Sequence, residues 1–133
     1  SILNLKLKNI SFFIKRRRLI AKKYFTGLKN LDIELPLVNK SNFHVFNMFV
    51  VSHPKRDLIL KKMRSKKINL AIHYPYPIHK MGAYKNYKYD NSNHLTATEK
   101  KSKMIFSLPI YPSIKNDEIE NIIKNINKIL LKI

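Results

Sequence analysis

Apolar residues recur at helical spacing over the first part of the chain. They follow a 4-3-4 pattern that is interrupted once, because Arg17 occupies an expected apolar position. The stripe consists of Leu3, Leu7, Ile10, Ile14, Ala21, Tyr24 and Leu28. This pattern predicts one long helix that ends at Gly27 and the turn-forming residues 29–30. No capping residue precedes the first apolar position, so we expect a helix that begins as though cut from a longer one.

A second helical pattern occupies the C-terminus, over residues 117–132. Its apolar positions are Ile119, Ile122, Ile123, Ile126, Leu130 and Ile133. Asn116 stands where a capping residue is expected, and Asp117 and Glu118 give an acidic first turn. Acidic side chains interact favourably with the positive end of the helix dipole, so the boundary of this helix is well marked.

Two shorter helices are expected in the middle of the chain. The first covers residues 54–66, where Pro54 suits the first turn and Asp57 suits the N-terminal dipole. Its apolar side is formed by Leu58, Leu60 and Met63. The second begins at Thr98-Glu99 and runs to about Met104.

Three runs rich in β-forming residues alternate with these helices: 45–51, 70–74 and 105–110. Pro109 and Pro112 close the last run and are typical of the edge of a sheet. We predict that the three runs form one small antiparallel or mixed sheet, covered by the helices 54–66 and 117–132. The fold class is therefore α+β, preceded by a long helix.

The apolar run Leu70–Ile72 leads directly into a segment with two prolines. Prolines fix φ, lack an N–H donor and push the preceding residues into extended conformations. The segment carries four polar or aromatic side chains, His73, Tyr74, Tyr76 and His79. It is either a rigid binding arm or a proline-rich connector whose aromatic rings cover the core, and periodicity alone favours the connector.

The net charge of +19 points first to a nucleic acid or an anionic surface. However, Lys, Asn and Ile together make up 54 of the 133 residues, and their codons are rich in A and T. Biased base composition explains such an excess without a polyanionic partner. Tyr84, Tyr87 and Tyr89 stand among lysines, as in proteins that stack single-stranded bases, although the same composition is typical of a surface loop. Arg16-Arg17-Arg18 is too short for a basic cluster.

The residues taken alone do not make a complete active site. The five histidines (His44, His53, His73, His79 and His94) lack metal-ligand spacing, so we expect no metal site. Two glycines are too few for a phosphate-binding loop, and the eight acidic residues are scattered. There is no cysteine, and no apolar run approaches the ~20 residues of a membrane span.

A series of short motifs nevertheless resembles the C-terminal region of the DegT/StrS sugar aminotransferases. In the first helix the matching residues are Ser1-Ile2-Leu3, Lys6-Leu7, Arg17-Arg18-Leu19-Ile20-Ala21, Tyr24 and Leu28. Further along they are Arg56-Asp57, Ile68, Ile72-His73-Tyr74-Pro75-Tyr76-Pro77-Ile78-His79, Ala83-Tyr84, Glu99 and Ser107-Leu108-Pro109-Ile110-Tyr111-Pro112. The resemblance covers nearly the whole chain in one order.

This resemblance implies part of a pyridoxal-phosphate (PLP) enzyme of the aspartate aminotransferase fold. Residues 1–29 would be the connecting helix, truncated at its start, and residues 30–133 the small C-terminal domain. The family's Schiff-base lysine, its acid at the pyridine nitrogen and its phosphate-binding groups lie in the N-terminal large domain. The resemblance therefore implies no catalytic or cofactor-binding residue in this chain, and it places His73, Tyr74, Tyr76 and His79 near the nucleotide-sugar entrance.

As a whole enzyme, the implied protein would be a cytoplasmic homodimer. It would transfer an amino group, from glutamate, to a nucleotide-linked keto-sugar in surface polysaccharide or amino-sugar biosynthesis. The sequence departs from the family at 96–98, Thr-Ala-Thr, where a proline usually precedes the acid matched by Glu99. We expect the chain alone to bind no PLP specifically, to be inactive, and to self-associate through its first helix. The alternative is a self-standing basic nucleic-acid-binding protein.

Overall fold

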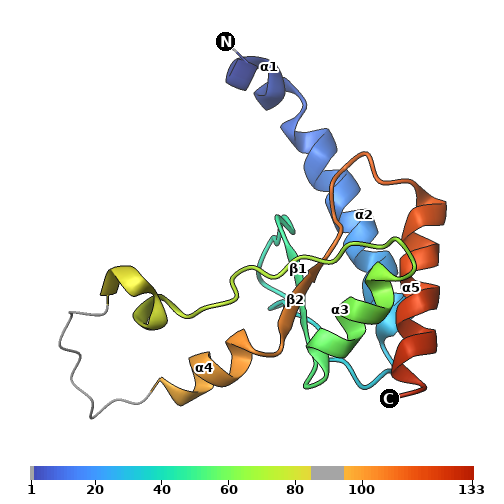
Figure 1. The fold of residues 1–133 in the computed structure, drawn as a ribbon. Helices are drawn as coiled ribbons and strands as arrows, with labels where there is room; N and C mark the ends of the chain where they lie inside the picture. The colour runs from blue at the N-terminus through green and yellow to red at the C-terminus, as the bar shows by residue number, and fades with distance from the viewer. Residues whose placement is uncertain (1, 85–94) are drawn as a thin grey trace.

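The computed structural model describes residues 2–84 and 95–133. Its α-helices are α1 (Ile2–Lys8), α2 (Ile10–Leu28), α3 (Arg56–Arg64), α4 (Thr96–Ser102) and α5 (Asn116–Leu130), and its strands are β1 (Phe49–Ser52) and β2 (Ile105–Leu108). Two short 3-10 helices, η1 (Ile78–Lys80) and η2 (Gly82–Tyr84), lie between α3 and α4. In Figure 1, α2, α3 and α5 gather around the two strands, whereas η1, η2 and α4 project to the opposite side. This arrangement confirms the α+β class.

The core lies where α2, α3 and α5 meet one face of the sheet. β1 and β2 are antiparallel, and Phe49 pairs with Leu108 and Val51 with Phe106. All four side chains are buried, because alternate residues of a strand point to the same face. α5 adds the buried side chains Ile119, Ile122, Ile126 and Ile129. Each large apolar side chain removed from water contributes about 1.5–3 kcal/mol, so this cluster dominates the stability of the fold.

The predicted single N-terminal helix is two helices, separated at Asn9. The backbone of Asn9 has φ −103° and ψ 3°, outside the helical region, and its N–H donates to Lys6 O, three residues back. The C-terminal half of the predicted stripe is buried, together with Ile20, which the pattern did not include. Leu3 and Leu7 are exposed, at 77% and 65%. The self-association expected through the predicted N-terminal helix stays a prediction.

Gly27 does not end α2, which continues to Leu28. It lies instead at the contact between α2 and α5, where a Cβ on Gly27 would meet Ile123 Cγ2 at 2.6 Å. Its carbonyl accepts a hydrogen bond from Asn127 Nδ2 at 3.1 Å. The glycine therefore sets how closely the two helices approach.

Two of the three predicted strands pair as expected, but the first is shorter than 45–51. β1 begins only at Phe49, because Phe46 has a positive φ of 50° and turns the backbone out of the extended region. The N–H of Phe46 donates to His44 Nδ1 at 3.1 Å and stabilises this turn. β2 likewise ends at Leu108, directly before Pro109.

The third predicted strand, 70–74, is wrong as a strand. Only Ala71 pairs with the sheet, in an antiparallel bridge to Ser107 whose N–H donates to Ala71 O at 2.7 Å. The bridge is isolated, and Pro75 and Pro77 further along lack the backbone donors needed to resume pairing. A similar bridge joins Glu34 to Ser52 of β1, at the opposite edge of the sheet. The sequence pattern did not predict this bridge.

α3 is shorter than the predicted helix 54–66, and its buried side differs. Ile59 and Met63, four residues apart, face the core, whereas Leu58 is exposed. α4 begins at Thr96, before the predicted start at Thr98-Glu99, and ends at Ser102.

Glu99 joins α4 to η1. Its Oε1 lies 2.9 Å from His79 Nε2 and 3.3 Å from Lys80 Nζ. The hydrogen bond to His79, followed by that to Lys80, lowers the pKa of the Glu99 carboxyl below its ordinary value. A second ion pair, between Lys101 and Glu34, connects α4 to the segment that flanks β1.

The contact at Gly27 gives a first prediction. Gly27→Ala should destabilise the fold by about 1–2 kcal/mol, because overpacking against Ile123 outweighs the gain in helix propensity. Urea unfolding measures this change. Gly82→Ala is the control and should be neutral, since nothing lies within 4 Å of a Cβ there. In an Ile123→Ala background, Gly27→Ala should no longer destabilise; an unchanged penalty would contradict the close-approach explanation.

The Glu99 contacts give a second prediction, on pH. Because the folded-state pKa of Glu99 is lowered, its contribution to stability is fully present above the unfolded pKa of about 4.3 and is lost as pH falls through the folded value. Glu99→Gln lacks this contribution. The difference in unfolding free energy between wild type and Glu99→Gln should therefore shrink as pH falls from 5 toward 3. A difference that stays constant to pH 3 would contradict the assignment.

Candidate functional site

A cavity of about 330 Å³ lies at the end of the sheet where β1 begins and β2 ends. It is bounded by α2 and by three chain segments that meet here, around positions 47–48, 69–73 and 107–111. Its polar lining residues are Arg17, Asn47, Asn69, His73, Ser107 and Tyr111. None of its lining residues is an aspartate or glutamate. We call this cavity the Arg17 pocket.

The pairing of Ala71 with β2 places His73 in the Arg17 pocket. The imidazole Nδ1 of His73 lies 3.0 Å from Oγ of Ser107, a buried serine in the strand that Ala71 pairs with. The hydrogen bond fixes the orientation of the ring. Nδ1 is thereby occupied, and Nε2 is the ring nitrogen left to meet a ligand.

Arg17 reaches the same pocket from α2. It lies three, four and seven residues before Ile20, Ala21 and Tyr24, all buried, and so belongs to the core-facing side of the helix. Its Nε is buried and has no hydrogen-bond partner among residues 2–84 and 95–133. A buried guanidinium N–H without an acceptor is costly, so this atom requires an explanation.

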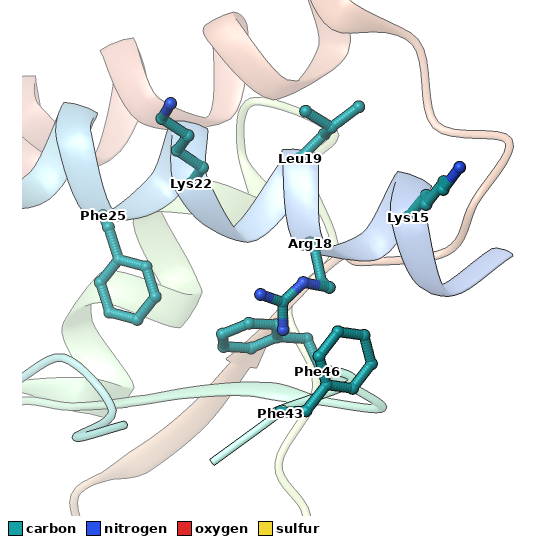
Figure 2. A pocket seen from close by; sticks show the side chains of 7 residues that line it. All are labelled: Lys15, Arg18, Leu19, Lys22, Phe25, Phe43 and Phe46. Atoms are coloured by element: carbon teal, nitrogen blue, oxygen red, sulfur yellow. The ribbon is translucent and has the colours of Figure 1, made fainter. Parts of the chain in front are cut away.

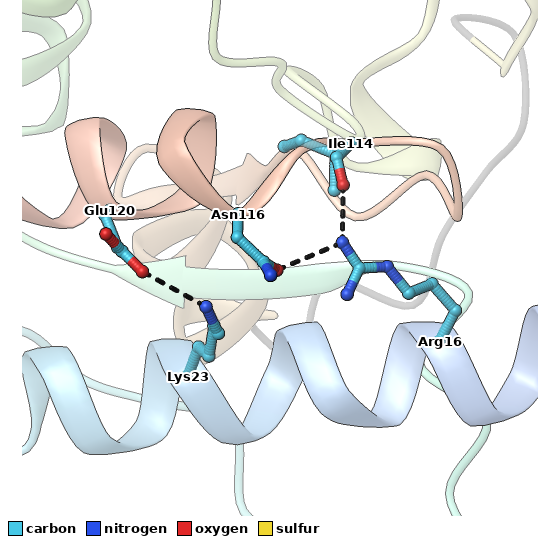
Figure 3. A network of polar contacts seen from close by, with 5 residues as sticks. All are labelled: Arg16, Lys23, Ile114, Asn116 and Glu120. Atoms are coloured by element: carbon cyan, nitrogen blue, oxygen red, sulfur yellow. Dashed lines mark hydrogen bonds and ion pairs between the residues drawn. The ribbon is translucent and has the colours of Figure 1, made fainter.

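The two neighbouring arginines, Arg16 and Arg18, donate hydrogen bonds to backbone carbonyl oxygens of the chain. Arg16 donates to the carbonyl oxygens of Pro112 at 3.3 Å and Ile114 at 2.7 Å, and Figure 3 shows it beside the Lys23–Glu120 ion pair that joins α2 to α5. Arg18 donates to His44 O at 2.7 Å. These two arginines therefore help to hold the fold together.

Tyr24 anchors the chain that forms the wall of the Arg17 pocket. Its hydroxyl donates to the carbonyl oxygen of Pro109 at 2.7 Å, directly after β2. Burial, and secondarily the neighbouring Tyr111, raises the pKa of the Tyr24 hydroxyl, so it stays protonated and remains a donor. The side of α2 that carries Arg17 is thus bound directly to the 107–111 segment.

Tyr74 and Tyr76 lie elsewhere. Both are about two-thirds exposed, at 67% and 66%, and both line a more apolar cavity of about 480 Å³ next to α4. The His73–Tyr74 peptide bond is cis. His79 lies on η1 and pairs with Glu99, as described above.

The four residues predicted to bind substrate therefore do not converge on one cavity. Only His73 lies in the Arg17 pocket. The sequence analysis did not assign a site role to Arg17 or Ser107. Arg17 had a visible signal, a cation in an otherwise apolar stripe. Ser107 stands in one of the short motifs noted in the sequence, but nothing there indicated its contact with His73.

A larger cavity, of about 650 Å³, lies on the other side of α2 (Figure 2). Phe25, Phe43 and Phe46 give it an apolar floor, and Lys15 and Lys22 stand at its rim. Its arginine is already used, because the Arg18 guanidinium stacks over the Phe43 ring at 4.3 Å. Its lining includes no uncommitted polar group comparable with Arg17 Nε.

The part of the chain that the structure describes holds no cluster of three His, Cys, Asp or Glu suited to a metal ion. His53 is buried, and its Nδ1 accepts the N–H of Lys55 at 2.9 Å, so it caps the turn before α3. His94, Tyr87 and Tyr89 lie outside the described residues. Among the described helices, none has the length and apolar character needed to cross a membrane.

Several known proteins with similar sequences are sugar transaminases. A dTDP-3-amino-3,4,6-trideoxy-alpha-D-glucose transaminase of Micromonospora megalomicea subsp. nigra is 37% identical over 134 residues. The match covers 97% of this chain and 36% of that protein. The chain thus spans about a third of the length of the curated relatives it matches.

Solved structures from the comparison have folds similar to that of this chain. S. venezuelae DesV, determined in complex with a ketimine intermediate, has a TM-score of 0.91 at 25% identity, covering 97% of this chain and 35% of its own. The fold of Spr1654 of Streptococcus pneumoniae, in its PLP form, is also similar, with a TM-score of 0.82 at 21% identity, covering 96% of this chain and 34% of its own. The DegT/DnrJ/EryC1/StrS aminotransferase family matches residues 1–127. The chain belongs to this family.

Proposed function

We propose that this chain is the C-terminal third of a PLP-dependent aminotransferase that transfers an amino group to a nucleotide-linked keto-sugar. Family membership over residues 1–127 and the transaminase names of the relatives support this function. The observation that carries it is a pocket in which a histidine is oriented by a buried serine. Imidazole N–H or N groups held in one orientation are suited to hydrogen-bond sugar hydroxyls or phosphate oxygens.

In this proposal residues 1–29 are the helix that connects to a large domain, and residues 30–133 form the small domain of an aspartate-aminotransferase fold. The exposed apolar residues of α1 support this division, because a connecting helix would bury such residues against the remainder of the protein. The whole enzyme would be a homodimer in the cytoplasm, taking its amino group from glutamate, and would serve surface polysaccharide or amino-sugar biosynthesis.

The Arg17 pocket does not by itself fit the cofactor. PLP enzymes need a lysine for the Schiff base and an acid facing the pyridine nitrogen, and neither residue type lines this pocket. Its polar side chains are hydrogen-bond donors and acceptors, and no lysine amine is among them. The role that remains for this chain is to bind and orient the substrate, with the cofactor groups supplied by the rest of the protein.

The arm residues divide between two tasks in this proposal. His73 contacts the substrate, and Tyr74 and Tyr76 offer exposed rings and hydroxyls at the entrance. His79 acts through Glu99 by holding η1 against α4, and so positions the segment that carries the tyrosines.

The function is tested with the polypeptide encoded by the complete reading frame around this chain. Purified with PLP, it should convert glutamate to 2-oxoglutarate in the presence of a dTDP- or UDP-linked keto-sugar, with the amino-sugar product identified by mass spectrometry. Absence of transfer across a panel of such sugars, in a folded protein, would contradict the proposal. Tight oligonucleotide binding with a steep salt dependence would favour a nucleic-acid-binding protein instead.

In that polypeptide, His73→Gln should raise the KM for the nucleotide-sugar about 10-fold, the loss expected for one hydrogen bond to a polar or charged group. Affinity for PLP should change less than about twofold, because the pocket does not hold the cofactor. Arg64→Gln is the control, since Arg64 is exposed and lines none of the cavities described above. Unchanged kinetics in both His73→Gln and Tyr74→Phe would contradict substrate binding by this segment and would indicate that it only packs against the core.

A further inference from the structure

We propose that Arg17 and His73 form a binding site for an oxyanion, the carboxylate or phosphate group of a substrate. The inference rests on the proposed function for the identity of the substrate, and its test does not use enzyme activity. It starts from one atom, Arg17 Nε, which is buried without a hydrogen-bond partner among the described residues.

The position of Arg17 makes a packing role a poor explanation. Its α-carbon lies on the core-facing side of α2, in the one position of the apolar stripe that is not apolar. A leucine or methionine there would bury the same surface without desolvating a charge. The neighbouring Arg16 and Arg18 show that this helix can satisfy arginines with backbone carbonyls, yet Arg17 Nε receives none.

The surroundings of Arg17 select the charge of the ligand. No acidic residue lines the pocket, so nothing in its lining neutralises the guanidinium. The other polar groups include the donors Asn47, Asn69 and Tyr111. Such a set attracts a group that is negatively charged and accepts several hydrogen bonds.

The geometry of Arg and His favours an oxyanion over a halide or a neutral hydroxyl. A guanidinium presents parallel N–H groups that match two oxygens of a carboxylate or phosphate. His73 adds Nε2, since Ser107 already occupies Nδ1 at 3.0 Å. A volume of about 330 Å³ has room for such a group and part of the molecule that carries it.

The test measures anion binding by the 133-residue chain with NMR, following the Arg17 Nε–H resonance. The probes are inorganic phosphate in one arm and glutamate in the other, each at 150 mM NaCl to suppress diffuse binding to the many lysines. The variants are Arg17→Gln, which removes the charge, and Arg17→Lys, which keeps it but loses the paired N–H geometry. Arg64→Gln is the control, because Arg64 is exposed and its loss changes the net charge equally.

We expect saturable shifts of Arg17 Nε–H and of residues lining the pocket. Affinity should fall about 10-fold or more in Arg17→Gln, fall less in Arg17→Lys, and stay unchanged in Arg64→Gln. Tighter binding of phosphate would assign the site to the nucleotide, and tighter binding of glutamate to the amino donor. Equal affinity in wild type and Arg17→Gln, or an equal loss in Arg64→Gln, would overturn the proposal.

Thermal unfolding without anion gives an independent readout. Arg17 is half-buried and its buried Nε–H has no acceptor, so Arg17→Gln should have a melting temperature equal to or above that of wild type. A clear fall in the melting temperature, or a variant that fails to fold, would show that Arg17 supports the structure and would overturn the proposal. A failed proposed function with intact Arg17-dependent binding would leave the oxyanion site standing.

Discussion

The structure depends on the packing of α2 against α5 and the sheet. Gly27 permits the close approach of the two helices, and the Tyr24 hydroxyl ties α2 to the backbone after β2 at 2.7 Å. Together these contacts fix which side of α2 faces inward. Arg17 is on that side, so the same packing that builds the core also carries a cation into the wall of a pocket. The packing of α2 is therefore sufficient to place Arg17 in the wall of the pocket.

The second half of the pocket depends on a single backbone pairing. Ala71 pairs with Ser107 at the edge of β2, and His73 follows two residues later, with its ring held by the serine hydroxyl. The bridge is isolated, and the prolines at 75 and 77 follow it without backbone donors to resume the pairing. The polar side chains of the arm therefore separate, with His73 held at the sheet edge and the tyrosines left exposed beside α4.

Elements with strong periodicity could be predicted from the sequence, and contacts between distant residues could not. The recurring apolar positions from Ile119 to Leu130 and the acidic start at Asp117 and Glu118 located α5 closely. The predicted strand 45–51 was too long, because Phe46 forms a turn in which its N–H donates a hydrogen bond to His44 Nδ1, and no local pattern reveals this contact. For the site, the motifs around His73 and Ser107 were both visible, but the contact between these two residues became recognisable only when the strand pairing was known. Arg17 was visible as an exception to the stripe, and its meaning required the three-dimensional neighbours.

The central claim is that this chain supplies a substrate-binding surface while the cofactor groups lie elsewhere in the protein. Borohydride reduction of the purified 133-residue chain with PLP, followed by mass-spectrometric mapping of the modified lysines, tests this division directly. The account predicts weak labelling scattered over many of the 22 lysines, with no site favoured. Stoichiometric labelling of one lysine, together with amino transfer from glutamate, would show that the chain holds a complete active site and would contradict the account.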